Sequence, residues 1–214
     1  MIVDNVSKNV AGVILAGGLA SRMGGGDKSL KSLGKKTILE SVMDRLSPQV
    51  TTIVLNANGD PQRFSRYKIP VVHDQTAQFL GPLAGVLSGL DWAYENGFTQ
   101  IVTVAADTPF FPLTLVTTLS DVLSNSGTQI ALAATKKKGS KRIILHPTFG
   151  LWPVSLRNDL RSSLGLGVRK VVQWTEKHNH VEALFDVELG DPFFNVNTSE
   201  DLDQARRIIN LEVK

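Results

Sequence analysis

The sequence predicts a three-layer α/β fold, in which helices cover both faces of a mainly parallel sheet. Short β-branched apolar runs recur along the chain, and amphipathic segments with helical spacing lie between most of them. Parallel strands joined by right-handed crossovers bind ligands beyond their carboxyl ends. The polar residues that follow each apolar run are therefore the first candidates for a functional site.

Five apolar runs have the length and composition of buried strands, at residues 10–16, 52–56, 69–73, 100–106 and 129–134. Helices are expected at 37–46, where Ile38, Val42 and Leu46 share one face, and at 82–94, where Pro82 suits the first turn. The alternation of these elements supports the predicted layers.

The second half of the chain is expected to be more helical. The segment 136–142, KKKGSKR, is a charged connection between two apolar runs, which favours a β-hairpin tip or simply a solvated loop. Helical patterns follow at 154–164 and 168–178, then a strand at 181–185. A last helix is expected to begin at Thr198, whose hydroxyl can cap it while acidic residues occupy the first turn.

Composition sets limits on the class of protein. The chain has 214 residues, 42% of them hydrophobic, a net charge of +3 and no cysteine. The charge is too mild to indicate nucleic-acid binding, and the lack of cysteine excludes disulfides and thiolate chemistry. Because no apolar run reaches the roughly 20 residues of a membrane span and no secretory signal is recognisable, we expect a cytoplasmic protein without a membrane partner.

The strongest local signal is a Gly-rich loop, LAGGLASRMGGGDKS, at residues 15–29. Its glycines let backbone N–H groups approach an anion, while Arg22 and Lys28 supply the charge that a triphosphate needs. A Walker A loop does not fit, because Asp27 precedes Lys28, and the spacing of Gly17 and Gly18 does not fit a dinucleotide fingerprint.

The pattern L-A-G-G-x-x-x-R-M-G-x-x-x-K resembles the signature loop of nucleotidyltransferases that act on sugar phosphates and on the molybdenum cofactor. Its form is most similar to the molybdenum cofactor guanylyltransferases, because Gly17 stands where enzymes that use pyrimidine triphosphates tend to have Ala. The resemblance implies a Rossmann-like nucleotidyltransferase fold, with 1–214 as one domain whose N-terminal half binds GTP and whose C-terminal half binds the acceptor. It also implies Mg²⁺ as cofactor.

Polar residues at the predicted strand ends supply the rest of the nucleotide site. Asp107 follows the strand at 100–106, where a carboxylate suits Mg²⁺, although an isolated Asp is more often a turn former. Asn56 and Asp74 end or follow two other strands and share the same rim. The resemblance assigns catalysis to Arg22, Lys28 and Asp107, with Asp107 as metal ligand. It assigns nucleotide binding to Leu15, Ala16, Gly17, Gly18, Gly25, Lys28, Asn56, Asp74, Gly85 and Asp107.

Three short motifs resemble the acceptor region of the same family: G-P-L-A-G from Gly81, H-P-T from His146 and N-V-N-T from Asn195. These motifs, together with one basic candidate, suggest five acceptor-binding residues. They are Pro82, His146, Arg169, Asn195 and Asn197. Since side chains alternate along an extended segment, only one of the two asparagines is expected to face the site. The tip at 136–142 and Ser199, where Pro is common, depart from the family pattern.

These residues predict transfer of GMP from GTP to molybdenum-molybdopterin by in-line attack on the α-phosphorus. A CTP-dependent molybdopterin cytidylyltransferase and a sugar-1-phosphate nucleotidyltransferase are alternatives of the same class. A non-catalytic GTP-binding adaptor is an alternative of another class. The resemblance also implies transient contacts with proteins that synthesise or insert the cofactor.

Overall fold

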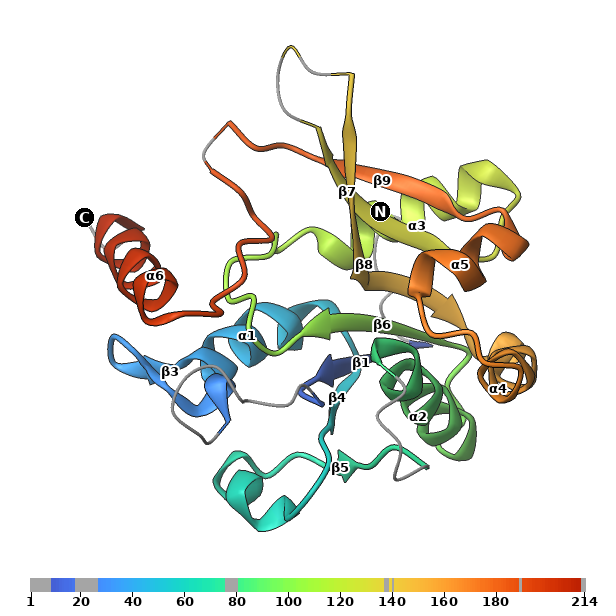
Figure 1. The fold of residues 1–214 in the computed structure, drawn as a ribbon, viewed down its shortest axis with the longest axis horizontal. Coiled ribbons are helices and arrows are strands. Elements are labelled where there is room, and N and C mark those ends of the chain that lie inside the picture. The colour runs from blue at the N-terminus through green and yellow to red at the C-terminus, as the bar shows by residue number, and fades with distance from the viewer. Residues whose placement is uncertain are drawn as a thin grey trace.

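A seven-stranded sheet forms the centre of the computed structural model, which describes residues 9–17, 27–75, 81–136, 139, 141–188 and 190–212. The strand order is β5-β4-β1-β6-β8-β7-β9 (Figure 1). All pairings in it are parallel except those of β8 with β6 and β7. The strands are β1 (Val10–Leu15), β4 (Thr52–Asn56), β5 (Val71–Val72), β6 (Gln100–Ala105), β7 (Ala131–Lys136), β8 (Ile143–Pro153) and β9 (Val181–Phe185). The predicted mainly parallel sheet is thus confirmed.

Helices cover both faces of the sheet, because the central strands are apolar on both sides. Along β1, Val10 and Ile14 belong to one buried cluster, whereas Ala11 and Val13 belong to the other. The first cluster includes side chains of α1 (Ile38–Leu46) and α3 (Leu115–Ser126). The second includes side chains of α2 (Pro82–Glu95), α4 (Arg157–Gly165) and α5 (Val171–Thr175). The two clusters lie between the sheet and the helices on its two faces. The sheet and these two sets of helices are the three predicted layers.

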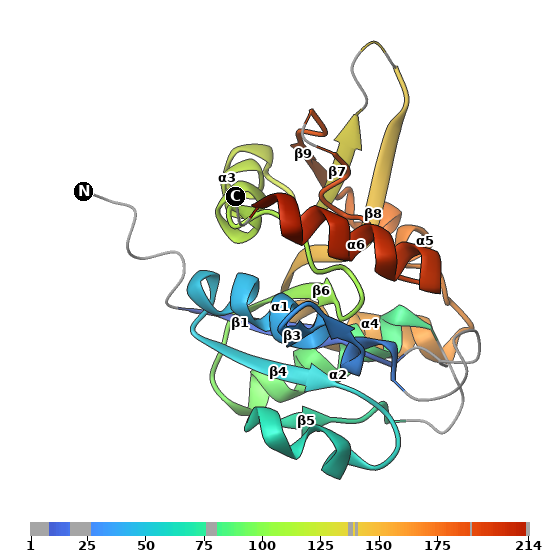
Figure 2. The same ribbon diagram turned by 90° about the vertical axis from the view of Figure 1, so that its left-hand side faces the viewer.

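A smaller third cluster attaches the C-terminal helix α6 (Ser199–Glu212) to the body. Leu202 and Ala205 of α6 pack with Leu33 and Ile38, beside the two-stranded sheet of β2 (Ser32–Leu33) and β3 (Lys36–Thr37) (Figures 1 and 2). The sequence did not predict this small sheet. Five 3-10 helices complete the described elements: η2 (Lys28–Leu30), η3 (Ser47–Gln49), η4 (Pro61–Tyr67), η5 (Val154–Leu156) and η6 (Glu176–His178).

The strands agree closely with the predicted ranges. β4 and β9 have the predicted bounds, and β1 and β6 each end one residue early. β5 is only two residues long, because it is an edge strand that pairs with β4 alone and follows Pro70, which has no N–H to donate. β7 lies two residues later than predicted and continues into the hairpin with β8, which confirms the hairpin across 136–142.

Local hydrogen bonds explain where two of the helices begin. Thr37 is the N-cap of α1, with its hydroxyl accepting from Glu40 N at 3.1 Å and the Glu40 carboxylate accepting from Thr37 N at 2.6 Å. Thr198 and Asp201 form the same reciprocal pair before α6, at 3.1 and 2.9 Å. The predicted cap at Thr198 is therefore confirmed, and the helix predicted from residue 37 begins one residue later. Within the described ranges, no helix combines the length and apolar character that crossing a bilayer requires.

One buried side chain ties α1 to the start of α3. Thr114, the N-cap of α3, makes no side-chain capping bond, and Gln49 takes over that function by accepting from Val116 N at 3.0 Å. Its amide nitrogen donates to the carbonyls of Arg45 and Pro112, at 2.8 and 3.2 Å.

Gln49→Leu should lower the free energy of unfolding by about 1–3 kcal/mol, because it leaves the buried N–H of Val116 without its partner. Urea unfolding followed by circular dichroism measures the change. Gln204→Leu on the exposed part of α6 is the matched control and should be close to neutral. Equal midpoints for the two variants would contradict this role of Gln49.

Candidate active site

The site lies where three parallel strands end at the same level. Leu15, the last residue of β1, is in register with Asn56 of β4 and with Ala105 of β6. The pairing continues past the strand ends, since Ala16 N donates to Asn56 O at 2.8 Å and Ala106 N to Leu15 O at 3.0 Å. The residues that follow these strands therefore meet at one rim of the sheet, as the sequence predicted.

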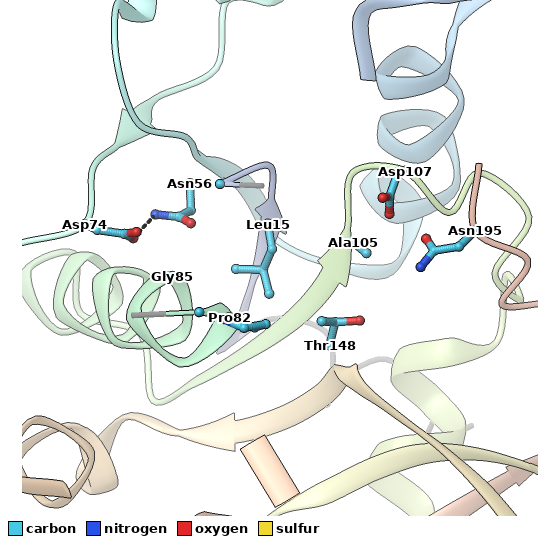
Figure 3. A pocket seen from close by; sticks show the side chains of 11 residues that line it. Leu15, Asn56, Asp74, Pro82, Gly85, Ala105, Asp107, Thr148 and Asn195 are labelled. Carbon is cyan, nitrogen blue, oxygen red and sulfur yellow. Dashed lines mark hydrogen bonds between the residues drawn. The ribbon is translucent and has the colours of Figure 1, made fainter. Parts of the chain in front are cut away.

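A pocket of about 220 Å³ opens at this rim. Figure 3 shows Asn56 and Asp74 at one end of it and Asp107 and Asn195 at the other, with Leu15 between them. It is lined by Leu15, Gly17, Asn56, Asp74, Gly81, Pro82, Gly85, Ala105, Asp107, Thr148 and Asn195. A smaller adjoining pocket of about 60 Å³ is lined by Leu15, Ala16, Asp27, Lys28, Ser29, Ala106 and Asp107.

The structure thus brings together most of the nucleotide-binding residues predicted from the sequence, together with Pro82 and Asn195 of the acceptor set. Gly18, Arg22 and Gly25 lie outside the described residues. Sequence reasoning did not select Gly81, Ala105 or Thr148 as lining residues. Gly81 belongs to the recognised motif G-P-L-A-G and Thr148 to H-P-T. Membership of these motifs was the signal that could have selected them.

At one end of the pocket, two asparagines hold the carboxylate of Asp74. Asn56 Nδ2 donates to Asp74 Oδ1 at 2.9 Å, and Asn58 Nδ2 donates to Asp74 Oδ2 at 2.7 Å. Asn56 is buried, and a Cβ added to Gly85 would stand 2.3 Å from its Oδ1. Any side chain at residue 85 would therefore collide with Asn56. Asn58 was not among the predicted residues.

Gly17 faces the same asparagines with more room. A Cβ there would lie 3.5 Å from Asn56 Oδ1 and 3.8 Å from Asn58 Nδ2, which are ordinary contact distances. The missing side chain leaves space at the pocket wall that the protein itself does not fill.

At the other end, an ion pair is joined by the C-terminal segment. Lys28 Nζ lies 3.2 Å from Asp107 Oδ2 and 2.7 Å from Asn197 Oδ1. Thr108 Oγ1 donates to Asn195 Oδ1 at 2.6 Å, and Val196 N donates to the Asp107 carbonyl at 2.8 Å. Both asparagines therefore contact residues of the site.

The two asparagines reach different places at this end: Asn195 lines the pocket, whereas Asn197 lines neither pocket and accepts from Lys28, so the expectation that only one of them faces the acceptor stays a prediction. Side chains alternate only along a regular strand, and residues 194–197 do not form one. The bond from Val196 N to Asp107 fixes this segment against the end of β6, so Asn195 reaches the pocket and Asn197 reaches Lys28.

The predicted acceptor residues His146 and Arg169 contact other parts of the protein instead of the pocket. His146 stacks on Phe193, with ring centroids 4.2 Å apart, and its Nε2 lies 2.9 Å from Thr135 Oγ1. Arg169 donates to the carbonyls of Leu164 and Val168, at 2.7 and 2.9 Å, and so holds the end of α4. Neither lines the pocket of the described residues. Their contact with an acceptor stays a prediction.

The match to a family model decides where the chain belongs. The model of the MobA-like NTP transferase domain matches residues 12–181, which include all the lining residues of the larger pocket except Asn195. The chain belongs to the MobA-like NTP transferase family. It is therefore a nucleotidyltransferase, as the Gly-rich loop indicated.

Relatives in this family are similar over almost the whole chain. A molybdenum cofactor guanylyltransferase of Bradyrhizobium sp. (strain ORS 278) is 45% identical, over 95% of this chain and 94% of the relative. One of Mesorhizobium japonicum is 44% identical, over 94% and 97%. Among solved structures, the molybdopterin-guanine dinucleotide biosynthesis protein A of Archaeoglobus fulgidus has a TM-score of 0.73 at 26% identity, covering 94% of this chain and 99% of that one.

His146 gives this MobA-like transferase a testable pH dependence. Burial lowers the pKa of His146 below its ordinary value of 6.5, with Asp191 opposing the shift. The folded protein therefore resists protonating this ring, whereas the unfolded chain accepts the proton near its ordinary pKa. The neutral ring therefore makes its full contribution to the free energy of unfolding above that ordinary pKa. This contribution is lost as the pH falls below it.

His146→Gln should therefore flatten the fall in unfolding free energy between about pH 7.5 and 5.5, because glutamine keeps a hydrogen-bonding group but does not titrate. Urea unfolding of both proteins across this range measures the slope. Parallel curves for wild type and variant would contradict the inference.

Proposed function

We propose that this chain transfers GMP from GTP to molybdenum-molybdopterin, forming molybdopterin guanine dinucleotide and pyrophosphate. One observation carries the proposal: a single pocket has a fixed carboxylate, Asp74, at one end and the Lys28–Asp107 pair beside its other end. Relatives named molybdenum cofactor guanylyltransferase, more than 40% identical over most of their length, support the choice of substrates.

The Asp74 end suits a guanine base. Guanine presents N–H donors on its Watson–Crick edge, and a carboxylate whose position is already fixed accepts from them without reorganising. A base without those donors leaves the remaining lone pairs of the carboxylate without a partner, and this strengthens discrimination. The space in front of Gly17 supports a purine rather than a pyrimidine, which disfavours the cytidylyltransferase alternative.

The Lys28 end suits the reacting phosphates. The acceptor's terminal phosphate oxygen forms a bond to the α-phosphorus of GTP while the bond between that phosphorus and the bridging oxygen to the β-phosphate breaks. Lys28 holds phosphate oxygens, and its ammonium neutralises charge that grows on the leaving pyrophosphate. No covalent intermediate with the protein is needed.

The residues at this end also fit Mg²⁺. Asp107 lines both pockets, and Mg²⁺ binds in many nucleotide sites through one or two protein carboxylates together with phosphate oxygens. Among the described residues no group of three or more His, Asp or Glu forms a protein-only cage. Asp107 would hold the ion with the triphosphate, and the ion would supply Lewis-acid charge neutralisation there.

Pro82, Thr148 and Asn195 line the same pocket, and we assign the acceptor to these residues. A sugar phosphate is a possible acceptor for the same chemistry, but the curated relatives favour molybdopterin. A GTP-binding adaptor would not need both Lys28 and Asp107. We further propose that the enzyme works in the cytoplasm and makes transient contacts with proteins that synthesise or insert the cofactor.

Calorimetric titration with GTP, ATP, CTP and UTP, each with and without Mg²⁺, tests the substrate. GTP should bind most tightly, and Mg²⁺ should strengthen its binding, because Asp107 and the triphosphate share the ion. Tighter binding of CTP would favour the cytidylyltransferase, and no binding of any nucleotide would refute the proposal.

Asp107→Asn tests the reaction. Asparagine can still accept from Lys28 but does not attract Mg²⁺ as a carboxylate does, so pyrophosphate release with GTP and molybdenum-molybdopterin should fall by roughly 10²–10³. GTP binding without Mg²⁺ should change little. Asp44→Asn, which breaks a solvent-exposed ion pair with Lys36, is the control and should keep full activity. Near-normal turnover by Asp107→Asn would remove Asp107 from the mechanism.

A further inference from the structure

Asn58 fixes Asp74 through both ends of its side chain. Its Nδ2 donates to Asp74 Oδ2 at 2.7 Å, and its Oδ1 accepts from Asp74 N at 2.9 Å. With Asn56 on Oδ1, each carboxylate oxygen of Asp74 has one asparagine donor and keeps a lone pair for a ligand. Rotation of this carboxylate would break both bonds, so Asn58 controls its orientation although Asn58 does not line the pocket.

Arg63 in turn fixes the backbone that carries Asn58. Its guanidinium donates to the carbonyl of Asn58 at 2.5 Å and to the carbonyl of Asp60. Gly59, between them, has φ +83°, and a Cβ there would stand 3.3 Å from Arg63 Nη1. The turn is therefore folded around the arginine. Asp60 also caps the 3-10 helix η4, from which Arg63 projects.

The Nε donor of Arg63 reaches the phosphate end of the site. Arg63 Nε pairs with Asp27, whose side chain is 18% exposed and which directly precedes Lys28. Asp27 is the N-cap of η2 but makes no side-chain capping bond. Its carboxylate is thus used for Arg63 and not for the helix that begins with Lys28, although Asp is a favoured capping residue.

We propose that Asn58 and Arg63 are positioning residues that couple the base end of the nucleotide site to its phosphate end, and that selectivity for guanine depends on both. The connection runs from Lys28 and Asp27 through the Arg63 fork and the Asn58 turn to Asp74. It rests on the proposed function, because it assumes that Asp74 reads the base. Only arginine suits the centre, since three contacts in different directions need a planar group with several donors.

A role in stability alone makes a different prediction from a positioning role. A loosened fold lowers the binding affinity for all nucleotides by the same factor. A misoriented Asp74 weakens the binding of GTP more than the binding of inosine triphosphate. Inosine triphosphate lacks the exocyclic amino group of guanine and therefore makes fewer hydrogen bonds to this carboxylate. The ratio of the two affinities is therefore the decisive quantity.

The test compares Asn58→Ala and Arg63→Lys with wild type by calorimetric titration of GTP and inosine triphosphate. Asn58→Ala should weaken GTP about tenfold, the effect of losing a hydrogen bond to a charged group, and should reduce the GTP preference accordingly. Arg63→Lys keeps the charge beside Asp27 but loses the fork, so the preference should fall in the same direction by a smaller factor. Since both act through Asp74, the double variant should show little further loss of preference.

Arg66→Lys is the matched control, because Arg66 lies on the same 3-10 helix and pairs with Glu40 at 2.7 Å, away from Asp74. It should leave the preference unchanged. Thermal unfolding of every variant checks the fold. If wild type prefers GTP to inosine triphosphate and both variants keep that preference, even with weaker binding overall, the inference is overturned. The proposed function is unaffected by this outcome. If wild type binds GTP and inosine triphosphate equally, Asp74 does not read the amino group and the inference fails, whereas the proposed function fails only if GTP is not preferred over ATP, CTP and UTP.

Discussion

The register of β1 is the constraint on which the rest of the site depends. Leu15 pairs with Asn56 on one side and with Ala105 on the other, so three strands end at one level. Burial on both faces fixes this register, because Ala11 and Val13 fill one core while Val10 and Ile14 fill the other. A slip of one residue would exchange the two sets and move every strand end. Apolar packing thus sets the positions of the polar groups at the rim.

The antiparallel strand β8 joins the two halves of the chain at this rim. It lies between β6 and β7, which are parallel to each other, and carries Thr148 to the pocket. The C-terminal segment then returns to the end of β6, where Val196 N bonds to the Asp107 carbonyl. Residues about 90 positions apart therefore form one wall. The proposed acceptor and nucleotide regions are adjacent because backbone bonds hold both halves together.

Much of this fold follows from local patterns. The ranges of β4 and β9 and the cap at Thr198 depend on neighbouring residues, so the sequence predicts them. The insertion of β8 between β6 and β7 depends on pairing between segments that are distant in the chain. Distant pairing, unlike periodicity, leaves no signal in a single sequence.

The same distinction holds within the site. Asn56, Asp74 and Asp107 were predictable, because each ends or follows a recognisable strand and polar groups at parallel strand ends converge. Asn58 and Arg63 were not, since their importance depends on a turn with positive φ at Gly59 and on contact with Asp27, 36 residues away in the chain. Nor was the position of both Asn195 and Asn197, which a single backbone bond determines.

The two ends of the pocket differ in how firmly they are held, and this difference matches their proposed tasks. Asn56 is buried, and its amide together with that of the exposed Asn58 orients the Asp74 carboxylate before any ligand arrives. Lys28 and Asp107 are each 22% exposed, and an ion pair that water can reach contributes little to stability. Separating them to receive a triphosphate and a cation therefore costs little, whereas a fully buried pair would resist. An oriented base reader supplies selectivity, and a reacting end that exchanges partners easily leaves its charges for the transition state.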